Sequence, residues 1–178
     1  MIQYGFLNMK MLPVYIDIEA SGLGNTSYPI EIAWNDPTGK VTRRLIKPAD
    51  GWRSWDFAAE RIHGISKEEI EKDGVLVGDL CNLIREDLRG VRVYSDAPKL
   101  EKFWLDRLFQ AGEKNDSPLL VLGVSSIPEI KQICYEKGLY TSFKEAAINE
   151  LKVTHRADAD VKIHMSIFKQ AREYCDRK

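Results

Sequence analysis

The sequence has little of what would mark a specialised class of protein. It contains only 3 cysteines, widely spaced and without a Cys-x-x-Cys pair, so we expect neither a disulfide framework nor a thiolate metal site. No apolar run approaches the ~20 residues that cross a bilayer, so we expect no membrane segment. Basic and acidic residues nearly cancel, at 26 against 27, which excludes a generally polycationic binder but leaves a local cleft for nucleic acid open.

What is present is typical of one globular domain. The chain has 178 residues, of which 44% are hydrophobic and 30% charged. A chain of this size builds a core of its own without disulfides or a structural metal. The three cysteines are interpreted as reduced thiols, and we therefore expect a cytoplasmic protein.

The hydrophobic pattern predicts an α/β fold. Five strands are expected, over residues 14–18, 30–34, 41–46, 91–94 and 119–124, the first three as an antiparallel meander. Helices are expected around residues 55–62, from Ser66, over 77–88, around 100–108, over 128–137, up to residue 151 and from residue 157. Ser66 with Glu69 and Ser142 with Glu145 are predicted capping boxes. The expected architecture is a mixed five-stranded sheet flanked by helices.

Two acids, Asp17 and Glu19, lie at the end of the first predicted strand and directly after it. Side chains two residues apart on a strand lie on the same face, so the two carboxylates are expected side by side. Such a pair is costly unless a cation lies between them, and magnesium or manganese ions prefer hard oxygen ligands. The alternative is a solvated strand end, because a D-x-E triplet by itself is common by chance.

A second candidate cluster begins the last predicted helix. His155 and Asp160 have the spacing H-x-x-x-x-D, which can place an imidazole and a carboxylate around one cleft. There the carboxylate could bind a metal ion and the imidazole could take a proton from water. The alternative is structural: His155 starts the helix, while Asp158 and Asp160 stabilise its positive N-terminus.

Taken together, these motifs resemble the DEDDh 3′–5′ exonucleases, the family of proofreading subunits, RNase T and oligoribonuclease. The resemblance rests on D-x-E-x-S-G-L from Asp17 and H-R-A-x-x-D from His155, and extends from about Leu12 to Phe168. Residues 28–32 and the His63-Gly64-Ile65-Ser66 stretch also resemble the family. It implies a ribonuclease H-like fold, with residues 12–178 as one exonuclease-like domain and residues 1–11 as a loose leader.

The middle acidic motif departs from the family pattern. Relatives usually carry an aromatic residue followed by Asp, with a bulky pair three and four residues later. Aligning Trp104 and Leu105 with the bulky pair puts Glu101 where the metal-binding Asp is expected. Asp96, at the end of the fourth predicted strand, is the rival ligand, and we favour Glu101 because its helix register matches.

The resemblance implies a metal-dependent exonuclease that shortens single-stranded DNA or RNA from the 3′ end and releases nucleoside 5′-monophosphates. Two magnesium or manganese ions are expected, with His155 as general base and a monomer or homodimer as the assembly. The implied metal ligands are Asp17, Glu19, Asp160 and either Glu101 or Asp96, and the implied substrate-binding residues are Ser21, Gly22, Leu23 and His63. The substituted middle motif leaves open a catalytically weakened nucleic-acid-binding module, and a phosphoesterase acting on small phosphates is a third interpretation.

Aromatic residues after the third predicted strand have two interpretations. Trp52, Trp55 and Phe57 could stack on a base, or they could belong to the core.

Overall fold

The computed structural model describes residues 11–152 and 155–177, so all of the expected leader except Met11 lies outside the described residues. One five-stranded sheet has the order β3-β2-β1-β4-β5, and β1, β2 and β3 form the predicted antiparallel meander, while β4 and β5 run parallel to β1. The mixed α/β sheet expected from the sequence is confirmed. The strands are β1 (Val14–Ala20), β2 (Pro29–Asn35), β3 (Val41–Leu45), β4 (Arg92–Ser95) and β5 (Leu120–Gly123).

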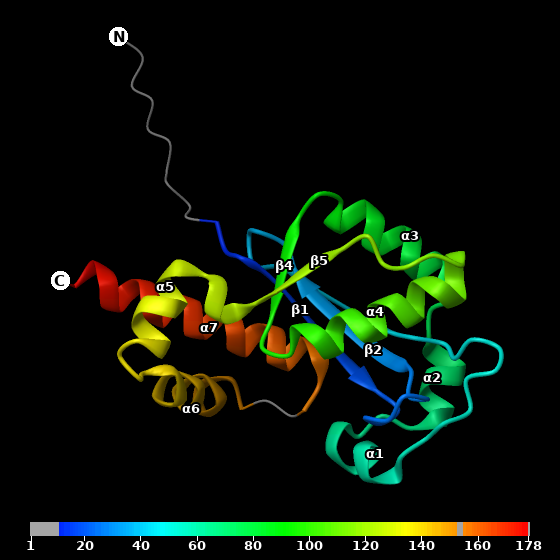
Figure 1. The fold of residues 1–178 in the computed structure, drawn as a ribbon. Helices are drawn as coiled ribbons and strands as arrows, with labels where there is room; N and C mark the ends of the chain where they lie inside the picture. Colours follow the sequence, from blue (N-terminus) through cyan, green and yellow to red (C-terminus); the bar gives the residue numbers. More distant parts are fainter. Residues whose placement is uncertain (1–10, 153–154, 178) are drawn as a thin grey trace.

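Helices surround this sheet in the described part of the chain (Figure 1). They are α1 (Phe57–His63), α2 (Lys67–Asp73), α3 (Val77–Leu88), α4 (Pro98–Glu113), α5 (Pro128–Ile130), α6 (Tyr140–Leu151) and α7 (Ala157–Asp176). The helix predicted over 128–137 is α5 followed by a π-helical turn, Lys131–Tyr135. No helix of the described residues is long and apolar enough to cross a membrane.

One of the two predicted capping boxes is wrong. The Ser66 hydroxyl accepts a hydrogen bond from the Glu69 N–H at 3.1 Å, as expected for a cap of α2. Ser142 instead lies inside α6, which begins at Tyr140. The first turn closes before Ser142 can cap it, because the Phe143 N–H donates to the Leu139 carbonyl at 3.0 Å.

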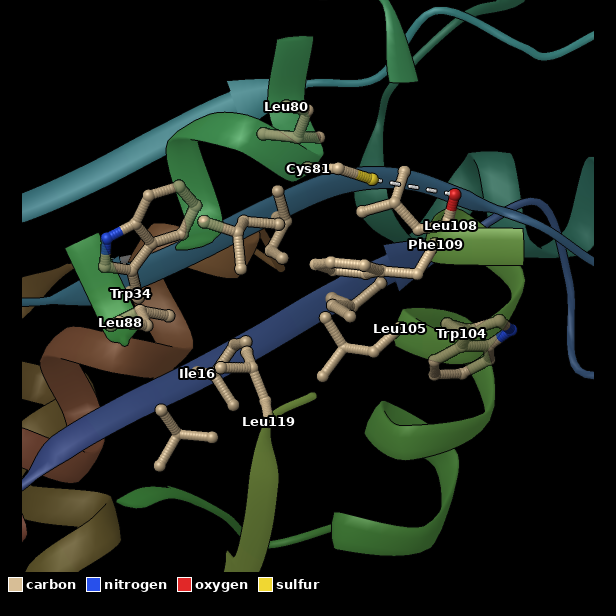
Figure 2. Close-up of a cluster of buried hydrophobic side chains, with 14 of the residues drawn as sticks. Ile16, Trp34, Leu80, Cys81, Leu88, Trp104, Leu105, Leu108, Phe109 and Leu119 are labelled. Atoms are coloured by element: carbon tan, nitrogen blue, oxygen red, sulfur yellow. Dashed lines mark hydrogen bonds between the residues drawn. The ribbon is translucent and has the colours of Figure 1, made fainter. Parts of the chain in front are cut away.

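Alternation along β1 and β2 directs side chains to two separate cores. Ile16 and Trp34 lie on the face covered by α3 and α4, where Cys81 and Phe109 are fully buried (Figure 2). Tyr15 and Ala33 belong to the opposite core, which packs against α7. Asp17 and Glu19 share the face of Tyr15, so they point toward α7.

Candidate active site

Three carboxylates from distant segments meet beside the sheet. Asp17 and Glu19 come from β1, which runs two residues further than predicted and so includes Glu19. Asp160 comes from the first turn of α7. One oxygen from each carboxylate lies within 4.8 Å of those from the other two, a spacing that suits a shared metal ion.

The electrostatics of the three acids show the cost of placing them together. Burial raises the pKa of Asp17 well above its usual range, and repulsion from Asp160 and Glu19 raises it further. Burial and repulsion from Asp160 raise the pKa of Glu19 to about 7. The pKa of Asp160 is also raised, chiefly by burial. A bound cation would remove this repulsion, and hard oxygen ligands fit magnesium or manganese.

Glu101 is a fourth acid, which is not among the three that meet within 4.8 Å but lies within electrostatic range of Asp17. It lies in the first turn of α4 with only 3% of its surface exposed, and its Oε2 has no hydrogen-bond partner among the described residues. Burial raises its pKa well above the usual range, and among the neighbouring charges Asp17 contributes most. A buried, unpartnered carboxylate oxygen is costly, and a cation at this position would satisfy it.

Asp96 lies nearby but already has a lysine and an imidazole beside its carboxylate. Its Oδ1 is 3.7 Å from His164 Nε2, and its Oδ2 is 3.8 Å from Lys144 Nζ. The pKa of Asp96 is lowered, first by the hydrogen bond with His164 and then by the charges of His164 and Lys144. The carboxylate of Asp96 is therefore stabilised by protein groups alone, whereas that of Glu101 is not.

His155 lies at the entrance to α7, one residue before Arg156. Its side chain is exposed. Burial and the charge of Asp96 raise the pKa of Asp160, and His155 is close enough to Asp160 to lower that pKa slightly. A side chain that is open to solvent and within electrostatic range of Asp160 suits a group that exchanges protons with water.

A hollow of about 340 Å³ opens beside Glu19. Apolar side chains line most of it, among them Ile62 and Leu23, which is 80% exposed. Gly22 forms part of the rim with φ of 156°, and a Cβ there would lie 3.1 Å from Asp56 Cβ. A mostly apolar hollow next to a carboxylate cluster suits a nucleoside whose phosphate reaches the acids.

His63 supplies a polar group to the wall of this hollow. It is buried, and its Nδ1 accepts a hydrogen bond from the Ile65 N–H at 3.0 Å. Burial lowers the pKa of His63, so its neutral form is favoured and the free proton belongs on Nε2. Nε2 is buried without a partner among the described residues, which leaves one N–H donor for a ligand.

The remaining residues expected to bind substrate divide between the hollow and the scaffold. Ser21 is buried, and its hydroxyl accepts a hydrogen bond from the Tyr28 N–H at 3.1 Å, so its side chain closes a loop. Trp52 stacks on Tyr28 and belongs to the scaffold. Phe57, in contrast, is 67% exposed.

Two residues near the site were missed in the sequence. Lys144 reaches Asp96 from α6, and nothing in the pattern of that helix distinguishes it from other surface lysines. Glu31 binds the start of α7 from β2, and a signal for it existed. It lies between Ile30 and Ile32 in a strand buried along its whole length, where a charge requires a partner.

No protein-family model matches the sequence, and no curated protein matches it. Solved structures do match it in fold. Escherichia coli exonuclease I in complex with a 5cy-dT13 oligonucleotide has a TM-score of 0.68 and 16% identity, over 92% of this chain and 41% of that chain. The zinc-bound complex of the E. coli enzyme with single-stranded DNA has a TM-score of 0.67 and 15% identity, over 92% and 41%.

Exonuclease I from the moderate thermophile Methylocaldum szegediense gives a TM-score of 0.67 and 16% identity, over 90% of this chain and 40% of that chain. The chain thus spans about two fifths of the length of these structures. The fold expected from the motifs is confirmed, because this chain shares the fold of exonuclease I.

Proposed function

We propose that this chain is a metal-dependent 3′–5′ exonuclease that acts on single-stranded nucleic acid and releases nucleoside 5′-monophosphates. The observation that carries the proposal is the meeting of Asp17, Glu19 and Asp160 within 4.8 Å, on a fold shared with exonuclease I. The solved complexes of exonuclease I contain single-stranded DNA, which makes DNA the first substrate to test.

The donor set fits two divalent ions of the magnesium or manganese type. Asp17, Glu19 and Asp160 would hold them together with Glu101, whose buried Oε2 has no partner among the described residues. Asp96 is the weaker candidate because Lys144 and His164 already contact its carboxylate. Bound ions of this kind lower the pKa of water and offset the negative charge of the phosphate.

The chain's own residues supply the remaining steps. The hollow beside Glu19 holds the terminal nucleoside against Leu23 and Ile62, and His63 Nε2 donates a hydrogen bond to it. An imidazole nitrogen of His155 takes the proton from the attacking water, since this side chain lies beside Asp160 and open to solvent. Without bound cations, the negative carboxylates would repel the phosphate of the substrate.

The test is digestion of 5′-labelled single-stranded DNA and RNA oligomers with magnesium, with manganese and with EDTA. We expect a ladder that shortens from the 3′ end, that is lost with EDTA and that is abolished by Asp17→Asn and His155→Ala. Oligomers that stay intact with every metal would overturn the proposal. Retained binding without cleavage would then favour a nuclease-like binding module.

A pair of matched variants separates the two candidates for the fourth ligand. Glu101→Gln keeps the side-chain volume but removes the charge, and should abolish cleavage and weaken manganese binding. Asp96→Asn should retain most of both if Asp96 only pairs with His164 and Lys144. The reverse result would assign the ligand to Asp96.

A further inference from the structure

A buried ion pair outside the acid cluster joins the two segments that carry the acids, the sheet and the start of α7. Glu31 is on β2 directly opposite Glu19 of β1, and its side chain is fully buried. A carboxylate buried beside another carboxylate is strongly destabilising unless it is paired and hydrogen-bonded.

The partner is the segment that begins α7. Arg156 Nε lies 3.2 Å from Glu31 Oε1 and 3.0 Å from Oε2, while Nη2 lies 2.6 Å from Oε1. The Ala157 N–H donates to Oε2 at 3.1 Å. Arg43 is a second, more distant cation, with its Nε 3.5 Å from Oε1. The pairing with Arg156 is two-pronged, the geometry that makes guanidinium–carboxylate contacts strong and directional.

Glu31 also acts as a helix cap for α7. The N-cap residue Arg156 makes no side-chain capping bond of its own, and the Ala157 N–H is one of the backbone donors that a helix start leaves unpaired. The Glu31 carboxylate accepts this hydrogen bond and places negative charge at the positive end of the helix. The start of α7 is thus fixed to β2 by both side-chain and backbone contacts.

This anchor lies between the residues that the proposed reaction uses. His155 directly precedes Arg156, and the Asp160 N–H donates to the Arg156 carbonyl at 3.2 Å in the first turn. Glu19, one strand over, is the direct cross-strand neighbour of Glu31. Any shift of Arg156 against β2 would therefore move both His155 and Asp160 relative to the β1 acids.

We propose that Glu31 and Arg156 are positioning residues that dock the start of α7 on the sheet and thereby set the placement of Asp160 and His155 against Asp17 and Glu19. The inference rests on the proposed exonuclease function. It adds two residues that touch neither metal nor substrate but on which the metal site depends.

The first test compares Arg156→Lys with Arg43→Gln. Lysine keeps the charge but lacks the two-pronged geometry, so we expect roughly 10- to 100-fold weaker manganese binding by calorimetry and a comparable fall in kcat. KM should stay within about twofold, because the hollow that holds the terminal nucleoside is not lined by Arg156. Arg43→Gln removes the 3.5 Å contact with Glu31 and also the 3.4 Å contact of Arg43 Nη1 with Asp158 in the first turn of α7. Because Arg43 is an exposed side chain, both losses should be small, and manganese affinity and kcat should stay within about twofold.

A double variant, Glu31→Met with Arg156→Met, separates positioning from stability. Apolar replacement of a whole buried ion pair often preserves the fold, so the melting temperature should be largely kept. Manganese binding and kcat should nevertheless stay low, because the anchor at Ala157 is gone. Restored binding and activity in the double variant would overturn the inference and leave the pair with a stabilising role alone.

Arg156→Lys decides the matter if the double variant does not fold. Unchanged manganese affinity and kcat in Arg156→Lys would refute the positioning role. A wild-type protein that binds manganese without cleaving oligomers would refute the proposed function instead. Weakened manganese binding in Arg156→Lys would then still support the role of the pair in assembling the site.

Discussion

The repulsion among the acids predicts that Glu19→Gln stabilises the metal-free protein at high pH. Glu19 has its pKa raised from 4.5 to about 7 by burial and by repulsion from Asp160 and Glu31. Because the pKa is higher in the folded state than in the unfolded state, folding favours the protonated carboxyl. The protonated carboxyl of Glu19 therefore contributes to the free energy of unfolding in full below about pH 4.5, and this contribution is lost as the pH rises to about 7. The glutamine amide of the variant never ionises, so it avoids this loss.

The magnitude follows from the shift in pKa. A rise from 4.5 to about 7 corresponds to about 3 kcal/mol, at ~1.4 kcal/mol for each tenfold change in proton affinity. This is a ceiling, because the partly exposed carboxyl is screened by solvent and titrates together with Asp17 and Asp160. For a domain of this size it corresponds to a gain in melting temperature of roughly 6–12 °C at most.

Thermal melts of wild type and Glu19→Gln in EDTA, from pH 5 to pH 8, measure the effect. The two proteins should differ little at pH 5, and the variant should melt several degrees higher at pH 8. Manganese at a thousandfold excess over Kd should reverse this order, because wild type then gains about 4.1 kcal/mol, more than the ceiling of about 3 kcal/mol, while the variant has lost a ligand. Glu68→Gln, at an exposed position in α2, serves as the control and should show no such trend. A difference between Glu19→Gln and wild type that is the same at every pH would refute the reasoning.

Three further substitutions probe the hollow and the core. His63→Gln removes the unpartnered Nε2 donor and should raise KM for oligomers roughly 3- to 10-fold in steady-state kinetics, and an unchanged KM would exclude contact with the substrate. Gly22→Ala should lower the free energy of unfolding in urea by about 1–3 kcal/mol, because φ is 156° and the new Cβ would meet Asp56 at 3.1 Å. The control is Gly24→Ala, which has open space around it and should leave the free energy of unfolding nearly unchanged. Phe109→Ala should cost about 3–5 kcal/mol in the same assay, since the ring is fully buried between α3, α4 and the sheet (Figure 2), and a loss below ~1 kcal/mol would contradict this packing.

The sequence predicted the sheet well because its signals are local. Alternation in the first three strands and the turn at residues 36–39 define a meander without any knowledge of distant contacts. The α6 start was wrong because a Ser-x-x-Glu spacing is also common inside helices. Here α6 already begins at Tyr140, and the Phe143 N–H donates to the Leu139 carbonyl, so Ser142 lies inside the first turn and cannot cap it.

The acids of β1 and α7 were identified because each motif is short and complete in itself. That they meet within 4.8 Å depends on how α7 crosses the sheet, which neither motif specifies. Glu31 shows which information the sequence does not contain. A glutamate between two isoleucines of a buried strand indicates that a cation must approach, but the partner is Arg156, 125 residues later, and only the folded chain identifies it.

The choice between Glu101 and Asp96 illustrates the same limit on a finer scale. Both lie near the β1 acids. The alignment of the middle motif favours Glu101, and Asp96 is its rival because it lies at the end of the fourth strand. What distinguishes them is the presence of neighbours from elsewhere in the chain: Lys144 of α6 and His164 of α7 approach Asp96, while Glu101 Oε2 has no partner among the described residues. A bound cation stabilises a carboxylate less when other protein groups already contact it than when it is buried and unpaired. This contrast is why we propose Glu101 as the fourth ligand: one extra methylene at the start of α4 changes the reach of the side chain and not its charge.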